Sequence, residues 1–257
     1  MSGSGAEGSD AMDDEFDTMP RWTVEAIESL GAAHAIPAAC RGSGNPAALT
    51  WLADMMNLGE TTTLVDVGAG TGGAAEYAAL TRGTSVLLVE PMLGACRAAT
   101  RLFGRATVAA SGTDLPLADG GADAVWSLGV LCSSADQLRM LEEMRRVTRP
   151  GGAVGLLVYI KTVADLPEQP DGNDFPTRDE LLDLVHRAGL RVGAVADLPD
   201  FDGPPQIWQQ QVQAVDDLVA REHRDDRRWQ TADTQQSTMG HLIGDGLVLG
   251  MLLSLTP

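Results

Sequence analysis

The chain has 257 residues, of which 44% are hydrophobic, and a formal net charge of −18. This length can bury one substantial core, so we expect one domain with additions at its edge. So large a negative charge disfavours nucleic acid and anionic membrane surfaces as partners, because both present negative phosphate groups. Lysine occurs once, at Lys161, so no basic stripe offsets the charge.

Cys40, Cys96 and Cys132 are widely spaced and odd in number, and they match no disulfide framework or metal-ligand pattern. The N-terminus lacks the basic and apolar regions of a signal peptide. No apolar run approaches the ~20 residues that a membrane span needs. We therefore expect a soluble, cytoplasmic protein with free thiols and no metal site.

Residues 1–17 are small, polar and acidic, and we expect a disordered tail there. Two helices with apolar stripes follow within residues 18–58, at Pro20–Leu30 and Ala47–Met56. The glycine-rich polar segment Arg41–Asn45 connects them.

The stretch Thr63–Glu90 has the pattern of a strand, a glycine turn, a helix and a second strand. The turn Gly68–Gly73 separates the apolar strand from the helix-favouring run Ala74–Leu80, and Ser85–Val89 is the second strand. Parallel strands joined by a helix cross over right-handed, which places the turn and Glu90 together at the strands' carboxyl ends. Open α/β sheets bind their ligands at that edge.

Two cofactors compete for this turn. Gly68, Gly70 and Gly73 fit the dinucleotide fingerprint, and Glu90 is placed to accept ribose hydroxyls. Asp66 favours S-adenosylmethionine, because a carboxylate ~5 Å from a pyrophosphate would be repelled by about 3 kcal/mol per charge pair at a dielectric of ~20. The same carboxylate attracts an ammonium or a sulfonium. Asp66 could instead cap the turn, which suits either ligand.

The remaining chain alternates strands and helices, which predicts an α/β fold. The helix after Pro91 ends at Phe103, a capping box at Ser134 and Gln137 opens another, and one at Thr177 and Glu180 opens Leu181–Ala188. Two helical runs, Ile207–Arg221 and Arg224–Leu242, precede the last strand. The further predicted strands are Arg105–Ala110, Ala122–Leu131, Ala153–Ile160, Arg191–Ala196 and Gly246–Leu255.

Five of these segments, in order over residues 60–200, resemble motifs of the class I S-adenosylmethionine-dependent methyltransferases. They are Asp66-x-Gly68-x-Gly70-x-Gly72, Val86–Glu90, Ser111–Leu117, Ala122–Ser127 and Val147–Gly152. The resemblance implies a Rossmann-like, seven-stranded, mostly parallel sheet with helices on both faces. It implies S-adenosylmethionine as cofactor, bound by Asp66, Gly68, Ala69, Gly70, Glu90, Pro91, Thr113, Asp114, Leu115, Leu128 and Gly129.

The layout is similar to the small-molecule, ubiquinone-biosynthesis-like branch of that family. Amino-group methyltransferases of nucleic acids and proteins carry an Asn or Asp, two prolines and an aromatic residue where this chain has Ser127–Val130. The absence of that motif, with the acidic charge, favours a small-molecule substrate.

The same resemblance implies an N-terminal helical lid over residues 18–58 and a methyltransferase domain over residues 59–257. Residues 203–242 are an insertion before the last strand, which we expect to cover the substrate opposite the lid. Dimerisation through the insertion is the alternative. We expect substrate contacts from Arg41, Asn45, Tyr159 and Trp208.

Methyl transfer from a sulfonium is an in-line displacement in which the protein mainly aligns the nucleophile and excludes water. A general base is needed only for an acceptor that is protonated at working pH, and the candidates are His34, His223 and His241. An ordinary packing role is the alternative for each. Three other activities stay open: a non-methylating reaction such as cyclisation, a dinucleotide-dependent oxidoreductase, and a non-enzymatic cofactor sensor.

Overall fold

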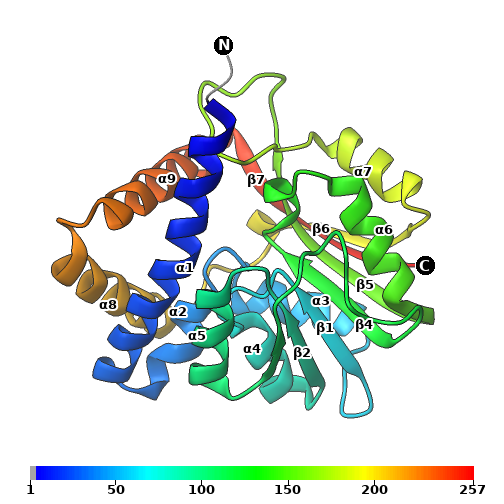
Figure 1. Cartoon of the computed structure of the whole chain (residues 1–257). Helices are drawn as coiled ribbons and strands as arrows, with labels where there is room; N and C mark the ends of the chain where they lie inside the picture. Colours follow the sequence, from blue (N-terminus) through cyan, green and yellow to red (C-terminus); the bar gives the residue numbers. More distant parts are fainter. Residues whose placement is uncertain (1–3) are drawn as a thin grey trace.

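A computed structural model of the chain describes residues 4–257, with side chains from Asp17 on, as a three-layer α/β structure (Figure 1). Its seven-stranded sheet has the order β3-β2-β1-β4-β5-β7-β6. Only β7 runs antiparallel, between β5 and β6. The strands are β1 Thr63–Val67, β2 Ser85–Val89, β3 Ala106–Val108, β4 Ala122–Leu128, β5 Thr148–Lys161, β6 Arg191–Asp197 and β7 Val248–Thr256. The predicted mostly parallel Rossmann-like sheet is confirmed.

Alternate residues of each strand point to opposite faces of the sheet. Helices pack on both faces and bury them. On one face Leu64, Trp126 and Leu157 pack with α3 (Pro46–Met55) and α4 (Gly73–Arg82). α5 (Leu93–Phe103) covers Leu88 on this same face. On the other face a larger apolar core joins the strands to α6 (Gln137–Val147) and α7 (Arg178–Arg187).

Four helices form a cap beside the sheet: α1 (Ser4–Leu30), α2 (Ala35–Ala39), α8 (Gln206–His223) and α9 (Arg227–Gly244). Trp22 and Ile27 of α1 share an apolar cluster with Val215 and Leu218 of α8. Figure 1 shows α1 in blue lying along α9 and crossing toward α5. The lid and the insertion therefore pack on each other, and their role as the two walls of a substrate site stays a prediction.

The structure places a helix, α1, over most of the stretch that we predicted to be a disordered tail. Residues 1–3 lie outside the described residues, and from Ser4 on the chain is helical, with Pro20 inside the helix rather than at its start. The Thr23 hydroxyl donates to the Met19 carbonyl at 2.9 Å in the turn around this proline. The first turn of a helix is costly to form, and packing of the apolar stripe of α1 offsets that cost. Each further residue then extends the helix more easily.

Capping side chains explain two shifted boundaries. α6 begins at Gln137 rather than near Ser134, because Asp136 caps it by accepting from the Arg139 N–H at 2.9 Å. Ser134 instead ends the short 3₁₀ turn Leu131–Ser133. The predicted capping box of Thr177 and Glu180 is confirmed at the start of α7.

Candidate cofactor and substrate site

The glycine turn after β1 bends back toward β2. Gly68 and Gly70 have φ of 74° and 54°, a left-handed conformation that favours glycine. The N–H groups of Gly68 and Ala69 donate to the Val89 carbonyl at 2.8 and 3.2 Å. A Cβ added at Gly68 would lie 2.6 Å from Val130, whereas one added at Gly70 would meet nothing within 4 Å. The open space along the turn is therefore at Gly70.

Glu90 follows β2 and closes the turn from the other side. One carboxylate oxygen accepts from the Gly70 N–H at 2.8 Å, and the other accepts from the Met92 N–H at 3.0 Å. Burial raises the pKa of Glu90, and these two bonds work against that rise. Each carboxylate oxygen keeps a second lone pair, so Glu90 retains acceptors for two ribose hydroxyls.

Asp66 is a buried carboxylate beneath the same turn, with 3% of its surface exposed. On the sheet it lies in register between Leu88 of β2 and Trp126 of β4. Burial raises its pKa to about 7; the Trp126 indole N–H lowers it in part, and the charge of Glu90 raises it further. The indole N–H faces this carboxylate from beyond normal hydrogen-bond distance, so among the described residues it makes no full hydrogen bond. Asp66 thus fits a cationic ligand group that would complete its charge balance.

The segment Thr113–Leu115 lies between β3 and β4, as predicted. Leu115 is buried in the core, whereas the Asp114 side chain is exposed. Side chains of α6 contact the backbone here: Glu143 accepts from the Leu115 N–H, and Arg139 donates to the Thr113 carbonyl. Sequence reasoning missed these α6 residues, although acid and arginine at helical i, i+3 and i, i+4 spacing was a visible signal.

The end of β4 lies under the connection between α2 and α3. Gly129 has φ of 77°, and a Cβ there would overlap the Gly42 carbonyl. Leu128 is buried just before it. Pro91, by contrast, is exposed beyond β2. The structure gathers Asp66, Gly68, Ala69, Gly70 and Glu90 around one turn, where Gly70 and Glu90 are hydrogen-bonded. The other predicted cofactor residues lie at or beyond the ends of β2, β3 and β4.

Three of the predicted substrate residues gather around the Arg41–Asn45 loop. The Tyr159 hydroxyl donates to the Gly42 carbonyl at 3.3 Å, and burial raises the Tyr159 pKa to about 12, so this phenol stays protonated. Asn45 uses its side-chain oxygen to cap α3, accepting from the Ala48 N–H at 3.0 Å. Arg41 is exposed. Burial raises the pKa of Asp216 on α8, and the positive charge of Arg41 works against that rise.

The fourth, Trp208, packs edge to face on Tyr77 of α4, with the ring centroids 6.1 Å apart. This contact joins the start of α8 to the helices over the sheet. The structure thus gives Trp208 a packing role, and its contact with substrate stays a prediction.

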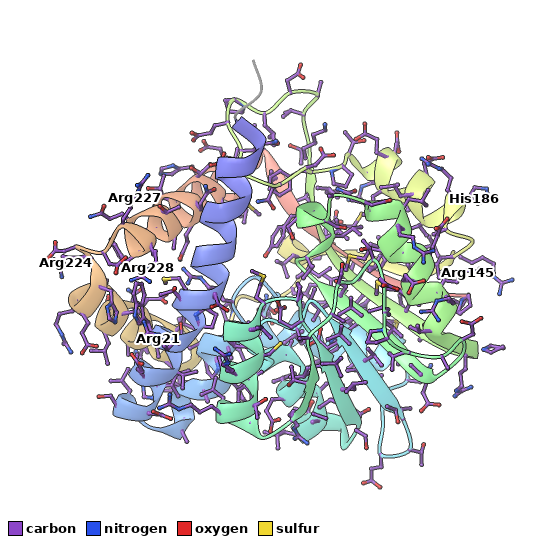
Figure 2. The ribbon with its side chains drawn as sticks, in the orientation of Figure 1. Arg21, Arg145, His186, Arg224, Arg227 and Arg228 are labelled. Carbon is purple, nitrogen blue, oxygen red and sulfur yellow. The ribbon has the colours of Figure 1, made fainter. Side chains whose placement is uncertain are left out.

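The three candidate bases lie on three different elements. His34 contacts the Gly31 carbonyl at 3.0 Å within a short turn, and His241 is exposed on α9. The His223 ring stacks on Trp22 of α1, with centroids 4.0 Å apart and planes 8° from parallel. Arg228, which Figure 2 labels on α9, lies 5.4 Å from the same Trp22 ring. Figure 2 also places His186 on α7, at the far side of the molecule from the cap.

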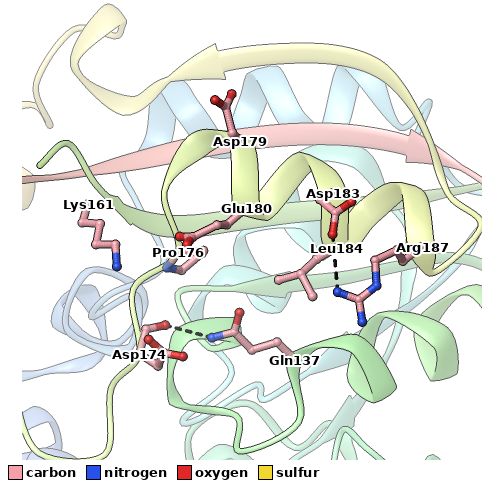
Figure 3. A pocket seen from close by; sticks show the side chains of 9 residues that line it. All are labelled: Gln137, Lys161, Asp174, Pro176, Asp179, Glu180, Asp183, Leu184 and Arg187. Carbon is pink, nitrogen blue, oxygen red and sulfur yellow. Dashed lines mark hydrogen bonds and ion pairs between the residues drawn. The ribbon is translucent and has the colours of Figure 1, made fainter. Parts of the chain in front are cut away.

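A surface hollow of about 520 Å³ lies on the α6–α7 side, away from these residues (Figure 3). Gln137, Lys161 and Asp174 line it together with side chains of α7. It contains none of the predicted cofactor, substrate or catalytic residues. Among the side chains that the structure describes, from Asp17 on, no three His, Cys, Asp or Glu residues gather as metal ligands.

Residues 65–156 match the protein family described as Methyltransferase domain. A glycine/sarcosine/dimethylglycine N-methyltransferase of Actinopolyspora halophila is 36% identical over 54% of this chain and 24% of its own length. An uncharacterized methyltransferase of Mycobacterium bovis is 33% identical over 66% of this chain and 61% of its own length. The chain thus spans less than two thirds of either relative.

Two solved structures share the fold. The [4+2]-cyclase SpnF superposes with a TM-score of 0.65 at 22% identity, over 81% of this chain and 79% of that one. A geranyl diphosphate methyltransferase in complex with GPP and sinefungin superposes with a TM-score of 0.59 at 18% identity, over 80% and 75%.

The family match and the fold agree: residues 65–156 match a methyltransferase domain, and they lie within the Rossmann-like sheet described above. The matches do not specify a ubiquinone-biosynthesis-like branch, which stays a prediction. In the described part of the chain, every helix is too short or too polar to cross a bilayer.

Proposed function

We propose that this protein is an S-adenosylmethionine-dependent methyltransferase that transfers a methyl group to a small-molecule metabolite by in-line displacement. The buried Asp66 beneath the glycine turn carries this proposal, because a ligand with an ammonium or sulfonium group would stabilise its charge. A pyrophosphate in the same place would be repelled, because it carries the same negative charge as the Asp66 carboxylate. The residues that surround the turn therefore fit this cofactor better than a dinucleotide.

In this proposal, Asp66 and the turn Gly68–Gly70 hold the methionine end of the cofactor, and Glu90 accepts from the ribose hydroxyls. Asp114 accepts from the exocyclic amine of adenine, flanked by Thr113 and Leu115. Leu128 and Gly129 border the sulfonium. When bound, S-adenosylmethionine supplies an electrophilic methyl carbon on a good leaving group.

The acceptor then has to be aligned and shielded from water. The loop Arg41–Asn45 and the cap helices are the elements that we assign to this task, because the loop lies directly on the end of β4. One relative is a glycine/sarcosine/dimethylglycine N-methyltransferase and one solved structure is a geranyl diphosphate methyltransferase, so the acceptor atom is left open. A cytoplasmic location agrees with the three free thiols, Cys40, Cys96 and Cys132.

A non-methylating reaction such as cyclisation is the second candidate, since the fold is shared with a [4+2]-cyclase. Cofactor binding does not distinguish cyclisation from methyl transfer, but transfer of a labelled methyl group does. A cofactor-sensing module would bind without any turnover.

Calorimetric titration with S-adenosylmethionine, S-adenosylhomocysteine and nicotinamide dinucleotides tests the cofactor. We expect the first two to bind and the dinucleotides to remain silent; dinucleotide binding would overturn the proposal. Incubation with methyl-labelled S-adenosylmethionine and panels of small phenols, acids and amines then tests transfer. Binding of both sulfur nucleosides with no transfer to any acceptor class would favour the cyclase or sensor alternative.

Glu90→Ala tests the ribose assignment in the same titration. Loss of an acceptor for two hydroxyls should weaken S-adenosylhomocysteine binding by at least ~10-fold. Glu60→Ala, an acid outside the turn, is the matched control. Equal affinity of Glu90→Ala and the unsubstituted protein would remove Glu90 from the site.

A further inference from the structure

A buried acid on α6, Glu143, holds the loop that carries Asp114. The Glu143 side chain is 1% exposed, and one of its oxygens accepts from the Leu115 N–H at 2.9 Å. Leu115 directly follows Asp114 in the chain. A charged group this deeply buried is costly unless its partners compensate it fully.

Two arginines of α6 provide that compensation and also reach the loop. Arg146 donates to Glu143 from two nitrogens, at 2.6 and 2.8 Å. It further donates to the carbonyls of Leu115 and Leu117, at 3.0 and 2.8 Å. Arg139 donates to Glu143 at 2.9 Å and to the Thr113 carbonyl at 3.3 Å. Three α6 side chains thus fix four backbone groups between Thr113 and Leu117.

Asp114 itself has little that fixes it. Its side chain is exposed, and its own backbone N–H donates to the Ser111 carbonyl at 3.2 Å. The position of its carboxylate is therefore set mainly by how rigidly the next residues are held. Apolar packing of Leu115 alone would anchor one point of the loop, whereas the α6 side chains fix its direction on both sides of Leu115.

We propose that Glu143 is a positioning residue for cofactor selectivity: with Arg139 and Arg146, it aims the Asp114 carboxylate at the exocyclic amine of the adenine ring. The inference rests on the proposed function, because it takes S-adenosylmethionine as the ligand. It adds that base recognition is controlled from α6, by residues that do not touch the cofactor.

The test is the ratio of affinities for S-adenosylhomocysteine and S-inosylhomocysteine, which presents a carbonyl oxygen in place of the amine. Asp114 should favour the adenosyl compound by at least ~10-fold, since a hydrogen bond to a charged group is replaced by repulsion between two acceptors. Glu143→Gln keeps the size and an oxygen for Leu115 but removes the charge that orders both arginines. We expect this variant to lower the ratio at least ~5-fold.

Glu142→Gln is the matched control. It removes one charge from the residue of α6 just before Glu143. The Glu142 side chain is 43% exposed and lies 3.8 Å from Arg139. The control should keep the ratio within ~2-fold, as expected for an exposed pair. Arg146→Lys is the second variant if Glu143→Gln fails to fold; it keeps the charge but lacks the planar fork for two carbonyls, and should lower the ratio too.

A Glu143→Gln variant that unfolds more easily but keeps the wild-type ratio would overturn the proposal, because Glu143 would then be structural only. Equal weakening of both nucleosides would also overturn it. If the unsubstituted protein binds neither nucleoside, the proposed function fails instead. If it binds both equally, S-adenosylhomocysteine binding still stands and the Asp114 assignment falls, together with this proposal.

Discussion

Asp66 is the side chain whose surroundings differ most from those of an ordinary surface acid. A pKa raised from 3.8 to about 7 means that the native state holds this proton more tightly than the unfolded chain does. The Asp66 contribution to stability is therefore fully present below pH ~4 and is lost as the pH rises toward ~7. The shift corresponds to at most on the order of 4 kcal/mol.

Asp66→Asn should remove this pH dependence, because the amide does not titrate. Urea unfolding of the ligand-free protein at pH 5 and pH 8 measures this dependence. We expect the free energy of unfolding of the variant to exceed that of the unsubstituted protein at pH 8 and to differ little from it at pH 5. The exposed Asp202→Asn is the control and should leave the difference unchanged. An Asp66→Asn variant with the original pH profile would show that Asp66 is ionised in the folded state throughout.

His223 illustrates how a polar ring is used for packing. Its stack on Trp22 joins α8 to α1, so His223→Ala should destabilise the protein by about 1 kcal/mol, the usual value of an aromatic pair. Methyl transfer should persist at a similar rate. The exposed His241→Ala is the control, expected to change neither. A loss of turnover above 100-fold with an unchanged melting temperature would instead make His223 the general base.

At the scale of elements, the contact between α1 and α5 depends on a glycine. The Asp17 carboxylate accepts from the Gly94 N–H at the start of α5, and a Cβ on Gly94 would overlap the Asp17 backbone. Gly94→Ala should therefore push α1 off α5 and destabilise the protein by about 1–3 kcal/mol, the usual cost of overpacking.

Thermal unfolding measures that loss, and tryptic cleavage at Arg21 reports release of α1. Gly240→Ala in α9 is the matched control, since nothing lies within 4 Å of the added Cβ. There alanine should stabilise the helix by about 0.5–1 kcal/mol, because glycine loses more backbone entropy. Equal effects of the two substitutions would mean that α1 does not rest on Gly94.

At the scale of elements, most strands and helices were predicted correctly from the sequence, because the signals that define them are local. The strands and α7 follow from apolar periodicity and from the Thr177–Glu180 capping box, which are local signals. The turn residues Asp66, Gly68 and Gly70 came together because a right-handed crossover leaves few alternatives.

What sequence reasoning missed depended on contacts distant in sequence. Nothing local tells that Trp22 meets His223, that Trp208 meets Tyr77, or that packing carries α1 through Pro20. Asp136 and Ser134 are both good capping residues, and only the tertiary path of the chain selects Asp136.

For the whole molecule, the net charge of −18 acts against the compact state through self-repulsion. Raising the salt concentration from ~0.02 to ~0.5 M shortens the Debye length several-fold, so we expect the melting temperature to rise by a few degrees. Scanning calorimetry with a non-ionic solute at equal osmolality as control measures this. A falling melting temperature would show that the ion pairs on its surface outweigh the repulsion.

The place of β7 has a consequence for synthesis on the ribosome. β6 pairs with β7 alone, and β7 also covers the edge of β5, yet the whole of α8 and α9 is translated between β6 and β7. Until residues 248–256 emerge, the nascent chain presents an open edge at β5 and a β6 segment without a partner strand. Unpaired strand edges are sites of aggregation. This sheet is therefore completed only after α8 and α9 have been synthesised, and a translation stall within α9 would leave β5 and β6 open to mispairing.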